Sequence, residues 1–293
     1  MPFADGGTVC PIDGTALALA PGGALVCARG HNFDRAREGY YNLLVVQHKA
    51  SRDPGDSKPM VAARRRVLDS GVYAPIAERV SDLVAGIVDR LPEGRDARVL
   101  DAGCGEGYYL ARIAGRLGAG ERHCHCAGID ISKWAVQAAA KRSDFCFWAV
   151  GTNRHLPFAP QSLDVIVCMF GFPVWDSFAE TLAPGGRVVL ADPGPDHLIE
   201  LRAIIYPQVR SADPAAEIPE AAARAGFCRS DQERLTFQIS LDTPDLIADI
   251  LAMTPHDHRA PVAGRQALAA LSSLRVTADI IIRQLGRPRL NEI

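Results

Sequence analysis

The chain has 293 residues, of which 48% are hydrophobic and 23% charged, and a formal net charge of −2. This length suffices for one large domain with a small additional module, and the near-neutral charge excludes a protein that attracts a polyanion through an overall basic field. The eight cysteines lack disulfide-framework spacing, the first residues lack a secretory signal, and no apolar run could span a membrane. We therefore expect a cytoplasmic protein.

The first 48 residues are glycine-rich and carry Cys10, Asp13, Cys27 and His31. The spacings Cys-x-x-Asp and Cys-x-x-x-His are those of zinc-ribbon ligands, except that an aspartate stands where a thiolate is usual. Aspartate is a less common zinc ligand, so the four side chains could complete a tetrahedron that binds the metal more weakly. Residues 1–48 are predicted to form a small zinc-ribbon-like module, and whether it holds zinc stays open.

Residues 49–95 are expected to link this module to the rest of the chain. Asp53-Pro54-Gly55-Asp56 is typical of a turn, and helices are predicted over 59–70 and 74–91. From Arg29 to Arg66 there are nine basic and four acidic residues, a pattern that suits either a solvated face or a surface that contacts phosphates. Arg64, Arg65 and Arg66 are consecutive, so at most one or two of them could share a helix face.

From Arg98 onward, short apolar segments alternate with helical stretches. The apolar segments are RVLDAG, HCHCAGID, FCFWAV, DVIVCMF and GRVVLAD. This alternation predicts an α/β domain over residues 96–293, with a Rossmann-like, doubly wound and mostly parallel sheet. A helix over 219–225, a strand over 234–241, a helix over 243–253 and a strand over 278–282 are expected to complete it. His123-Cys124-His125-Cys126 is interpreted as part of a strand rather than as a metal site, because alternation sends the two pairs to opposite faces.

The first of these strands ends in a glycine-rich turn, VLDAGCGEGYY. Gly103, Gly105 and Gly107 would let the backbone pass close to a ligand, and Asp101 precedes them. The spacing G-x-G-x-G differs from the G-x-G-x-x-G of dinucleotide folds, and a phosphate-binding loop usually avoids so close an acid. S-adenosylmethionine has no phosphate and carries a sulfonium and an ammonium, so a carboxylate suits it.

A second acid, Asp130, ends the next predicted strand in the segment GIDIS. A carboxylate at that point can accept hydrogen bonds from both ribose hydroxyls of a nucleoside. Together with the glycine turn, this acid predicts an enzyme that depends on S-adenosylmethionine. A nicotinamide-dependent oxidoreductase would need the third glycine at its own spacing, which the chain lacks.

The segments DAGCGEGYY, GID and LAPGGRVVL resemble the class I S-adenosylmethionine-dependent methyltransferases. The further segments EGYYNLLVVQHKASRDPGD, LDSGVYAP, ADPGPDHLIEL and AMTP are similar to the bacterial 23S rRNA guanine-N1 methyltransferases, over almost the whole chain. The resemblance implies an N-terminal zinc module that helps to grip an rRNA hairpin, followed by a catalytic domain. It also implies cofactor contacts at Tyr73, Gly105, Glu106 and His197.

The acceptor is expected against the loop MFGFPVWDSFAETLAPGG, residues 169–186. The candidate catalytic residues there are Phe170, Phe172, Pro173, Trp175 and Asp176. An aromatic wall could stack a purine or hold a sulfonium, and guanine N1 must lose a proton during transfer.

Two hypotheses on the acceptor stay open, because both this loop and the zinc ligands depart from the family pattern. The first is methyl transfer to guanine in a 23S rRNA hairpin. The alternative is a repurposed enzyme that acts on a small molecule or on S-adenosylmethionine itself. In the latter reaction the methionine amine would displace methylthioadenosine and form azetidine-2-carboxylate. A homodimer is also left open.

Overall fold

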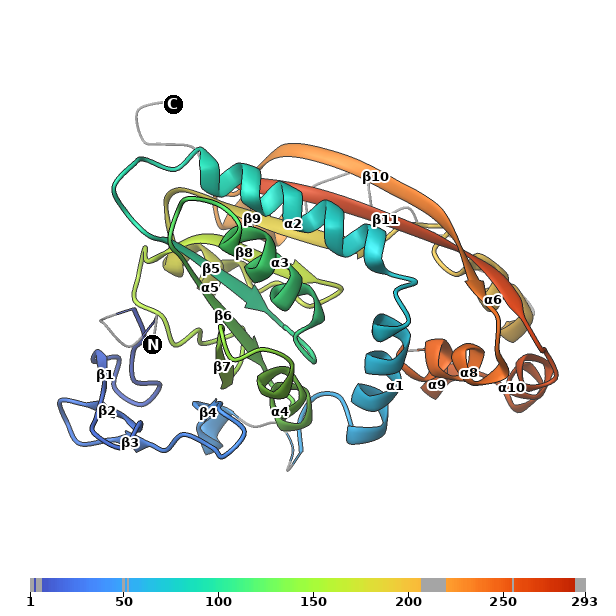
Figure 1. Cartoon of the computed structure of the whole chain (residues 1–293), viewed down its shortest axis with the longest axis horizontal. Helices are drawn as coiled ribbons and strands as arrows, with labels where there is room; N and C mark the ends of the chain where they lie inside the picture. The colour runs from blue at the N-terminus through green and yellow to red at the C-terminus, as the bar shows by residue number, and fades with distance from the viewer. Residues whose placement is uncertain are drawn as a thin grey trace.

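The computed structural model describes residues 3, 7–48, 51, 53–206, 220–254 and 256–287. An eight-stranded sheet forms its centre (Figure 1). In spatial order its strands are β10 (Cys228–Leu241), β11 (Leu274–Gly286), β9 (Leu182–Pro193), β8 (Leu163–Met169), β5 (Ala97–Ala102), β6 (Cys124–Asp130), β7 (Phe147–Val150) and β4 (Tyr41–Asn42). Neighbouring strands from β9 to β4 are parallel, whereas β11 and β10 are antiparallel, which confirms the predicted mostly parallel sheet.

The structure also describes helices, and several of them cover the two faces of the sheet. The helices are α1 (Lys58–Asp69), α2 (Ala74–Asp89), α3 (Tyr108–Gly118), α4 (Lys133–Arg142), α5 (Trp175–Thr181), α6 (Ile199–Ile205), α7 (Glu220–Arg224), α8 (Pro244–Ala252), α9 (His256–Arg259) and α10 (Val262–Ala269). Buried residues of α2, α3, α6 and α8 pack in one core, and those of α5 and α7 pack in a second core on the other face. None of the helices that the structure describes is long and apolar enough to cross a bilayer.

The N-terminal module is a ribbon of very short strands, β1 (Leu17–Leu19), β2 (Leu25–Cys27) and β3 (Asn32–Phe33), and the 3-10 helix η1 (Val46–His48) follows it. The ribbon lies beside the sheet and shares the second core, in which the Phe3 ring is 5.3 Å from the Phe158 ring. Tyr41 and Asn42 fall inside the predicted module but add β4 to the main sheet, parallel to β7. The boundary at residue 48 therefore stays a prediction.

The last two strands are longer than predicted. The strand expected over 234–241 begins at Cys228, and the one expected over 278–282 runs from Leu274 to Gly286. The first five residues of β10 are all exposed, so this part of the strand has no alternation of apolar residues by which it could be recognised. After β9, residues 195–198 form a turn and α6 begins at Ile199. Pro219 of the predicted 219–225 helix lies outside the described residues.

Candidate functional site

The glycine turn joins β5 to α3 at the strand where the chain order reverses. From β5 the chain moves to β6 and β7 on one side, then returns to β8 and β9 on the other, and ligands bind at such switch points in open α/β sheets. Gly103, Gly105 and Gly107 have positive φ angles of 93°, 55° and 81°, a conformation that side-chain-bearing residues rarely adopt. The turn therefore exposes backbone at the predicted cofactor position.

The Trp148 side chain packs against this turn, a role that the sequence did not indicate. A Cβ on Gly107 would lie 2.8 Å from the Trp148 ring, and one on Gly128 would lie 2.4 Å from it. The indole is fully buried, and its N–H donates to the backbone oxygen of Ser143 at 2.7 Å. Glycine at 107 and 128 is thus required by one large side chain from β7.

Asp101, near the end of β5, is buried without a partner. Its side chain is fully buried, and neither carboxylate oxygen has a hydrogen bond among the residues that the structure describes. Burial raises the pKa of Asp101 to about 8, with a further contribution from the negative charge of Asp130. A cationic ligand group would restore the ionised form, so this carboxyl group suits a sulfonium or an ammonium.

Asp130 holds the glycine turn against the end of β6. One carboxylate oxygen accepts the Gly105 N–H at 2.9 Å, and the other accepts the Ser132 N–H at 2.8 Å. Burial nevertheless raises its pKa above the ordinary value. Each oxygen keeps a lone pair, so the carboxylate can still accept hydrogen bonds from two hydroxyl groups.

Glu106 lies in the turn, but its carboxylate is turned toward α4. One oxygen accepts from Arg142 Nε at 2.7 Å, and Arg142 also pairs with Asp69 of α1 at 2.8 Å. The side chain of Glu106 is almost fully buried, and burial raises its pKa. This ion pair anchors the turn to α1 and α4, which leaves only the second oxygen of Glu106 for a ligand.

Tyr73, Tyr109, Phe170 and His197 form an aromatic cluster beyond the end of β8. The Phe170 ring stacks on His197 at 6.2 Å and lies 6.4 Å from Tyr73. Tyr73 Oη is 3.4 Å from His197 Nε2. Burial lowers the pKa of His197 to about 4, and its Nδ1 accepts the Asp279 N–H at 3.3 Å, so the neutral ring carries its proton on Nε2. Tyr73, Phe170 and His197, which were predicted from the sequence, therefore lie in contact with one another.

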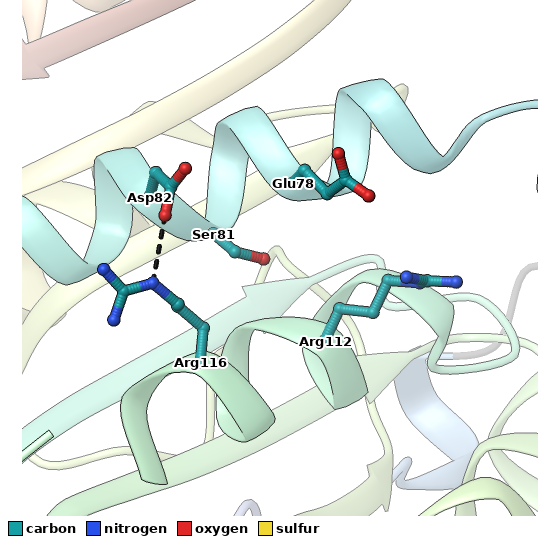
Figure 2. Close-up of a pocket in the computed structure, with 5 residues that line it drawn as sticks. All are labelled: Glu78, Ser81, Asp82, Arg112 and Arg116. Atoms are coloured by element: carbon teal, nitrogen blue, oxygen red, sulfur yellow. Dashed lines mark hydrogen bonds and ion pairs between the residues drawn. The ribbon is translucent and has the colours of Figure 1, made fainter. Parts of the chain in front are cut away.

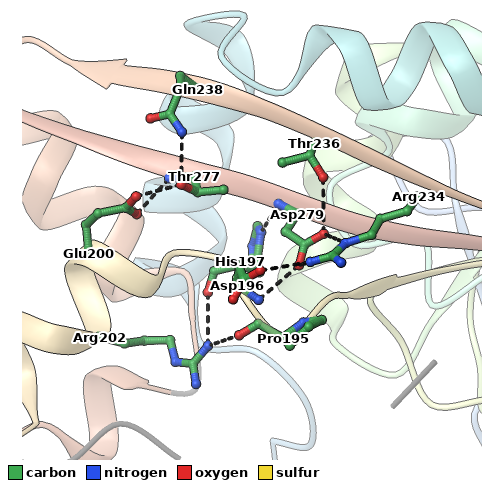
Figure 3. A network of polar contacts seen from close by, with 10 residues as sticks. All are labelled: Pro195, Asp196, His197, Glu200, Arg202, Arg234, Thr236, Gln238, Thr277 and Asp279. Atoms are coloured by element: carbon green, nitrogen blue, oxygen red, sulfur yellow. Dashed lines mark hydrogen bonds and ion pairs between the residues drawn. The ribbon is translucent and has the colours of Figure 1, made fainter. Parts of the chain in front are cut away.

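A polar network fixes the turn that carries His197 (Figure 3). Asp279 of β11 accepts two hydrogen bonds from Arg234 at 2.6 and 2.8 Å and one from the Asp196 N–H at 2.9 Å. A Cβ on Gly194 would lie 2.3 Å from the Asp279 carboxylate. Arg234 and Asp279 lie on strands distant in sequence from Gly194, which is why this network was not predicted.

The remaining candidates of the acceptor loop do not join the aromatic cluster. Phe172 is 88% exposed, Pro173 is half-buried, and Asp176 is exposed at the start of α5. Trp175 is buried in the second core, with its ring 5.2 Å from that of Phe227. The expected single wall of Phe170, Phe172 and Trp175 is thus not formed, because α5 turns the indole into the core.

The four predicted metal ligands converge in the ribbon. His31 Nδ1 is 3.4 Å from both thiol sulfurs, those of Cys10 and Cys27, and 3.1 Å from Asp13 Oδ2. Asp13 Oδ2 is also 3.6 Å from the sulfur of Cys27. Zinc–ligand bonds of about 2.0–2.3 Å at tetrahedral angles would separate the ligand atoms by roughly 3.3–3.8 Å, so the donor set fits zinc.

Thr15 orients the carboxylate of Asp13 within this donor set. Its N–H and hydroxyl donate to Asp13 Oδ1 at 2.9 and 2.6 Å, which leaves Oδ2 facing the sulfurs.

Two other features lie away from this site. Between α2 and α3 there is a cavity of about 320 Å³ lined by Glu78, Ser81, Asp82, Arg112 and Arg116 (Figure 2). It contains none of the residues at the strand ends. His123 and His125 both contact Asp96, at 3.2 and 3.0 Å, near the opposite end of β6, which is a strand as predicted.

Comparison with known proteins agrees with this geometry. Residues 8–52 match the family model of the RlmA N-terminal zinc ribbon, and residues 99–203 match that of a methyltransferase domain. The 23S rRNA (guanine(748)-N(1))-methyltransferase of Streptomyces fradiae is 33% identical over 90% of this chain and 91% of its own. YxjB of Bacillus subtilis, named provisionally as a 23S rRNA (guanine-N(1)-)-methyltransferase, is 31% identical over 93% of this chain and 94% of its own.

Among solved structures, YcgJ of Bacillus subtilis covers 72% of this chain and 99% of its own, with 19% identity and a TM-score of 0.47. The whole-chain relatives and the two family models, one for each part of the molecule, point to the same enzymes. The chain belongs to the S-adenosylmethionine-dependent 23S rRNA (guanine-N1) methyltransferases with an N-terminal zinc ribbon.

Proposed function

We propose that the chain binds S-adenosylmethionine at the carboxyl ends of β5 and β6 and transfers its methyl group to N1 of a guanine in a 23S rRNA hairpin. The observation that carries the cofactor site is the buried, unpartnered carboxyl group of Asp101 beside the glycine turn. Such a group is costly unless a ligand pairs with it, and the cationic methionine end of S-adenosylmethionine is a suitable partner.

The surrounding residues then have distinct tasks. Asp130 accepts the two ribose hydroxyls with the lone pairs that Gly105 and Ser132 leave. Gly103, Gly105 and Gly107 let the methionine moiety approach the backbone. Tyr73, His197 and the Phe170 ring border the sulfonium, where an aromatic face stabilises positive charge.

The acceptor side rests on the exposed part of the loop after β8. Phe172 is well placed to stack on an unpaired guanine, as aromatic side chains do in RNA recognition. Asp176 is an exposed acid of this loop, while Pro173 and Trp175 hold its shape. Catalysis then depends mainly on alignment of guanine N1 with the methyl–sulfur bond, and the N1 proton leaves to water or to a carboxylate.

The ribbon supplies the second contact with RNA. Zinc bound by Cys10, Asp13, Cys27 and His31 would close a module whose strands have only two or three residues. The name of the Streptomyces fradiae relative specifies guanine 748 of 23S rRNA, and we propose a guanine of the same rRNA class as the acceptor here. A homodimer is compatible with this proposal, and sedimentation with and without RNA tests it.

The test is methylation of a 23S rRNA hairpin with methyl-labelled S-adenosylmethionine. We expect label in the RNA, identified as N1-methylguanosine by mass spectrometry of the nucleosides and by a reverse-transcription stop at one guanine. Label at another atom or base would contradict the proposed acceptor. Absence of S-adenosylmethionine binding in calorimetry would contradict the cofactor site itself.

A further inference from the structure

Arg64 of α1 lies directly over the glycine turn. Its Nη1 is 3.6 Å from the position that a Cβ on Gly105 would occupy. The guanidinium pairs with the carboxylate of Asp56 and donates from Nη2 to the backbone oxygen of Met253 at 3.3 Å. About a quarter of the side chain, 27%, is exposed. A cation is therefore held over the predicted cofactor position by two segments distant in sequence from the turn.

The turn at residues 53–56 fixes Asp56, and through it Arg64, against the end of β6. Gly55 has a φ of 84°, and a Cβ there would lie 2.8 Å from Ile131 and 2.9 Å from Ser132. The Ser132 hydroxyl donates to the backbone oxygen of Asp56 at 2.7 Å. Since Ser132 also bonds to Asp130, the guanidinium is positioned relative to the same carboxylate that we assign to the ribose.

The neighbouring Arg65 and Arg66 form ion pairs away from the glycine turn. Arg65 pairs with Asp69 of its own helix, and Arg66 forms two hydrogen bonds to Asp249 of α8. The two described contacts of Arg64 engage one N–H each on Nη1 and Nη2, and a guanidinium has five donors in a planar fork. Arg64 thus differs from Arg65 and Arg66 in having donor capacity over the turn.

The methionine end of S-adenosylmethionine carries a carboxylate as well as an ammonium. Asp101, Glu106 and Asp130 place three carboxyl groups around the turn, and Arg142 is already engaged by Glu106 and Asp69. We propose that Arg64 binds the α-carboxylate of the cofactor and thereby makes the enzyme selective for S-adenosylmethionine over its decarboxylated form. This inference rests on the proposed cofactor site.

Calorimetry with S-adenosylmethionine and decarboxylated S-adenosylmethionine tests it, on the full chain and on Arg64→Met. The wild type should bind S-adenosylmethionine at least tenfold more tightly. Arg64→Met should weaken that binding about 10- to 100-fold, the range of hydrogen bonds to charged groups, and change the binding of the decarboxylated compound less than twofold. Arg65→Met, on the same helix, should leave both affinities unchanged.

Other outcomes assign failure to different steps. If the wild-type protein binds S-adenosylmethionine but Arg64→Met weakens the binding of both compounds equally, Arg64 acts only through Asp56 and the proposal is wrong. If the wild type binds neither compound, the proposed cofactor site itself fails. If Arg64→Met does not fold, as judged by its thermal transition, Arg64→Lys replaces it. The shorter reach of a lysine and its lack of a planar fork should reduce the preference for the carboxylated cofactor, and an undiminished preference would overturn the proposal.

Discussion

The glycine turn and the N-terminal ribbon both gather polar side chains, but different forces hold them in place. The turn follows a six-residue strand and lies beside a seven-residue one, and Trp148 supports it within a continuous core. The ribbon has strands of three, three and two residues, and its candidate ligands lie in loops or, for Cys27, at the end of β2. The cofactor site is therefore expected to persist without a ligand, whereas the ribbon is expected to depend on its metal.

The largest effect should come from the ribbon. Cys27→Ser removes a buried zinc ligand, so bound zinc and methylation of the rRNA hairpin should both be lost, while binding of S-adenosylmethionine stays within about twofold. Metal analysis, hairpin methylation and calorimetry measure the three quantities. Cys228→Ser, at an exposed cysteine of β10, is the matched control. Loss of cofactor binding in Cys27→Ser would show that the two regions are not independent.

Asp130→Ala alters the cofactor site and leaves the ribbon intact. It removes the acceptor of the Gly105 and Ser132 N–H groups and of the proposed ribose hydroxyls, so the Kd for S-adenosylmethionine should rise at least about tenfold while zinc content stays the same. Asp96→Asn, at an exposed acid just before β5, serves as the control. Unchanged affinity in Asp130→Ala would refute the assigned role.

Asp101 should make cofactor binding depend on pH. The pKa of about 8 means that the free enzyme holds a proton at neutral pH that a bound cation must expel. Affinity for S-adenosylmethionine should therefore fall as the pH falls below 8, by up to about tenfold per pH unit. Calorimetry at pH 7 in buffers of different ionisation enthalpy should detect release of nearly one proton, and Asp101→Asn should release none.

The same carboxyl group sets the sign of a stability effect in the free protein. The pKa of Asp101 in the folded protein lies above the value of about 3.9 for an unfolded aspartate. Its contribution to the free energy of unfolding is therefore fully present below about pH 4 and is lost as the pH rises through 8. His197, with a pKa of about 4, is already neutral in the folded protein at pH 6.5. Because an unfolded histidine has a pKa of about 6.5, His197 adds a smaller opposing slope near pH 6.5 that largely disappears by about pH 7.5. Thermal melts between pH 6.5 and 8.5 should thus show falling stability in the wild type and a flatter profile in Asp101→Asn.

A smaller effect is expected from Arg234→Met. The substitution leaves the Asp279 carboxylate with fewer donors and loosens the turn that carries His197. The Kd for S-adenosylmethionine should rise several-fold, with little change in hairpin affinity. Arg229→Met, an exposed arginine on the same strand, should have no effect on either value. Equal weakening by both variants would mean that the network does not act on the cofactor site.

The contrast also explains what could be predicted from sequence. The glycine turn, Asp101 and Asp130 are adjacent to strands with strong local patterns, and the zinc ligands have a recognisable spacing, so these groups could be proposed before the structure. Trp148, Arg64 and Asp279 contact the turn residues described above from at least 20 positions away, and no local sequence pattern encodes such contacts. The position of Trp175 depended on how α5 packs on Phe227, which a loop sequence does not specify.

Analysis of the reaction products distinguishes methyl transfer to RNA from a reaction of S-adenosylmethionine alone. The enzyme is incubated with S-adenosylmethionine, with and without a 23S rRNA hairpin, and the adenosine products are identified by mass spectrometry. We expect S-adenosylhomocysteine only when the hairpin is present. Methylthioadenosine formed without any acceptor, together with azetidine-2-carboxylate, would contradict this expectation and would establish the intramolecular reaction instead.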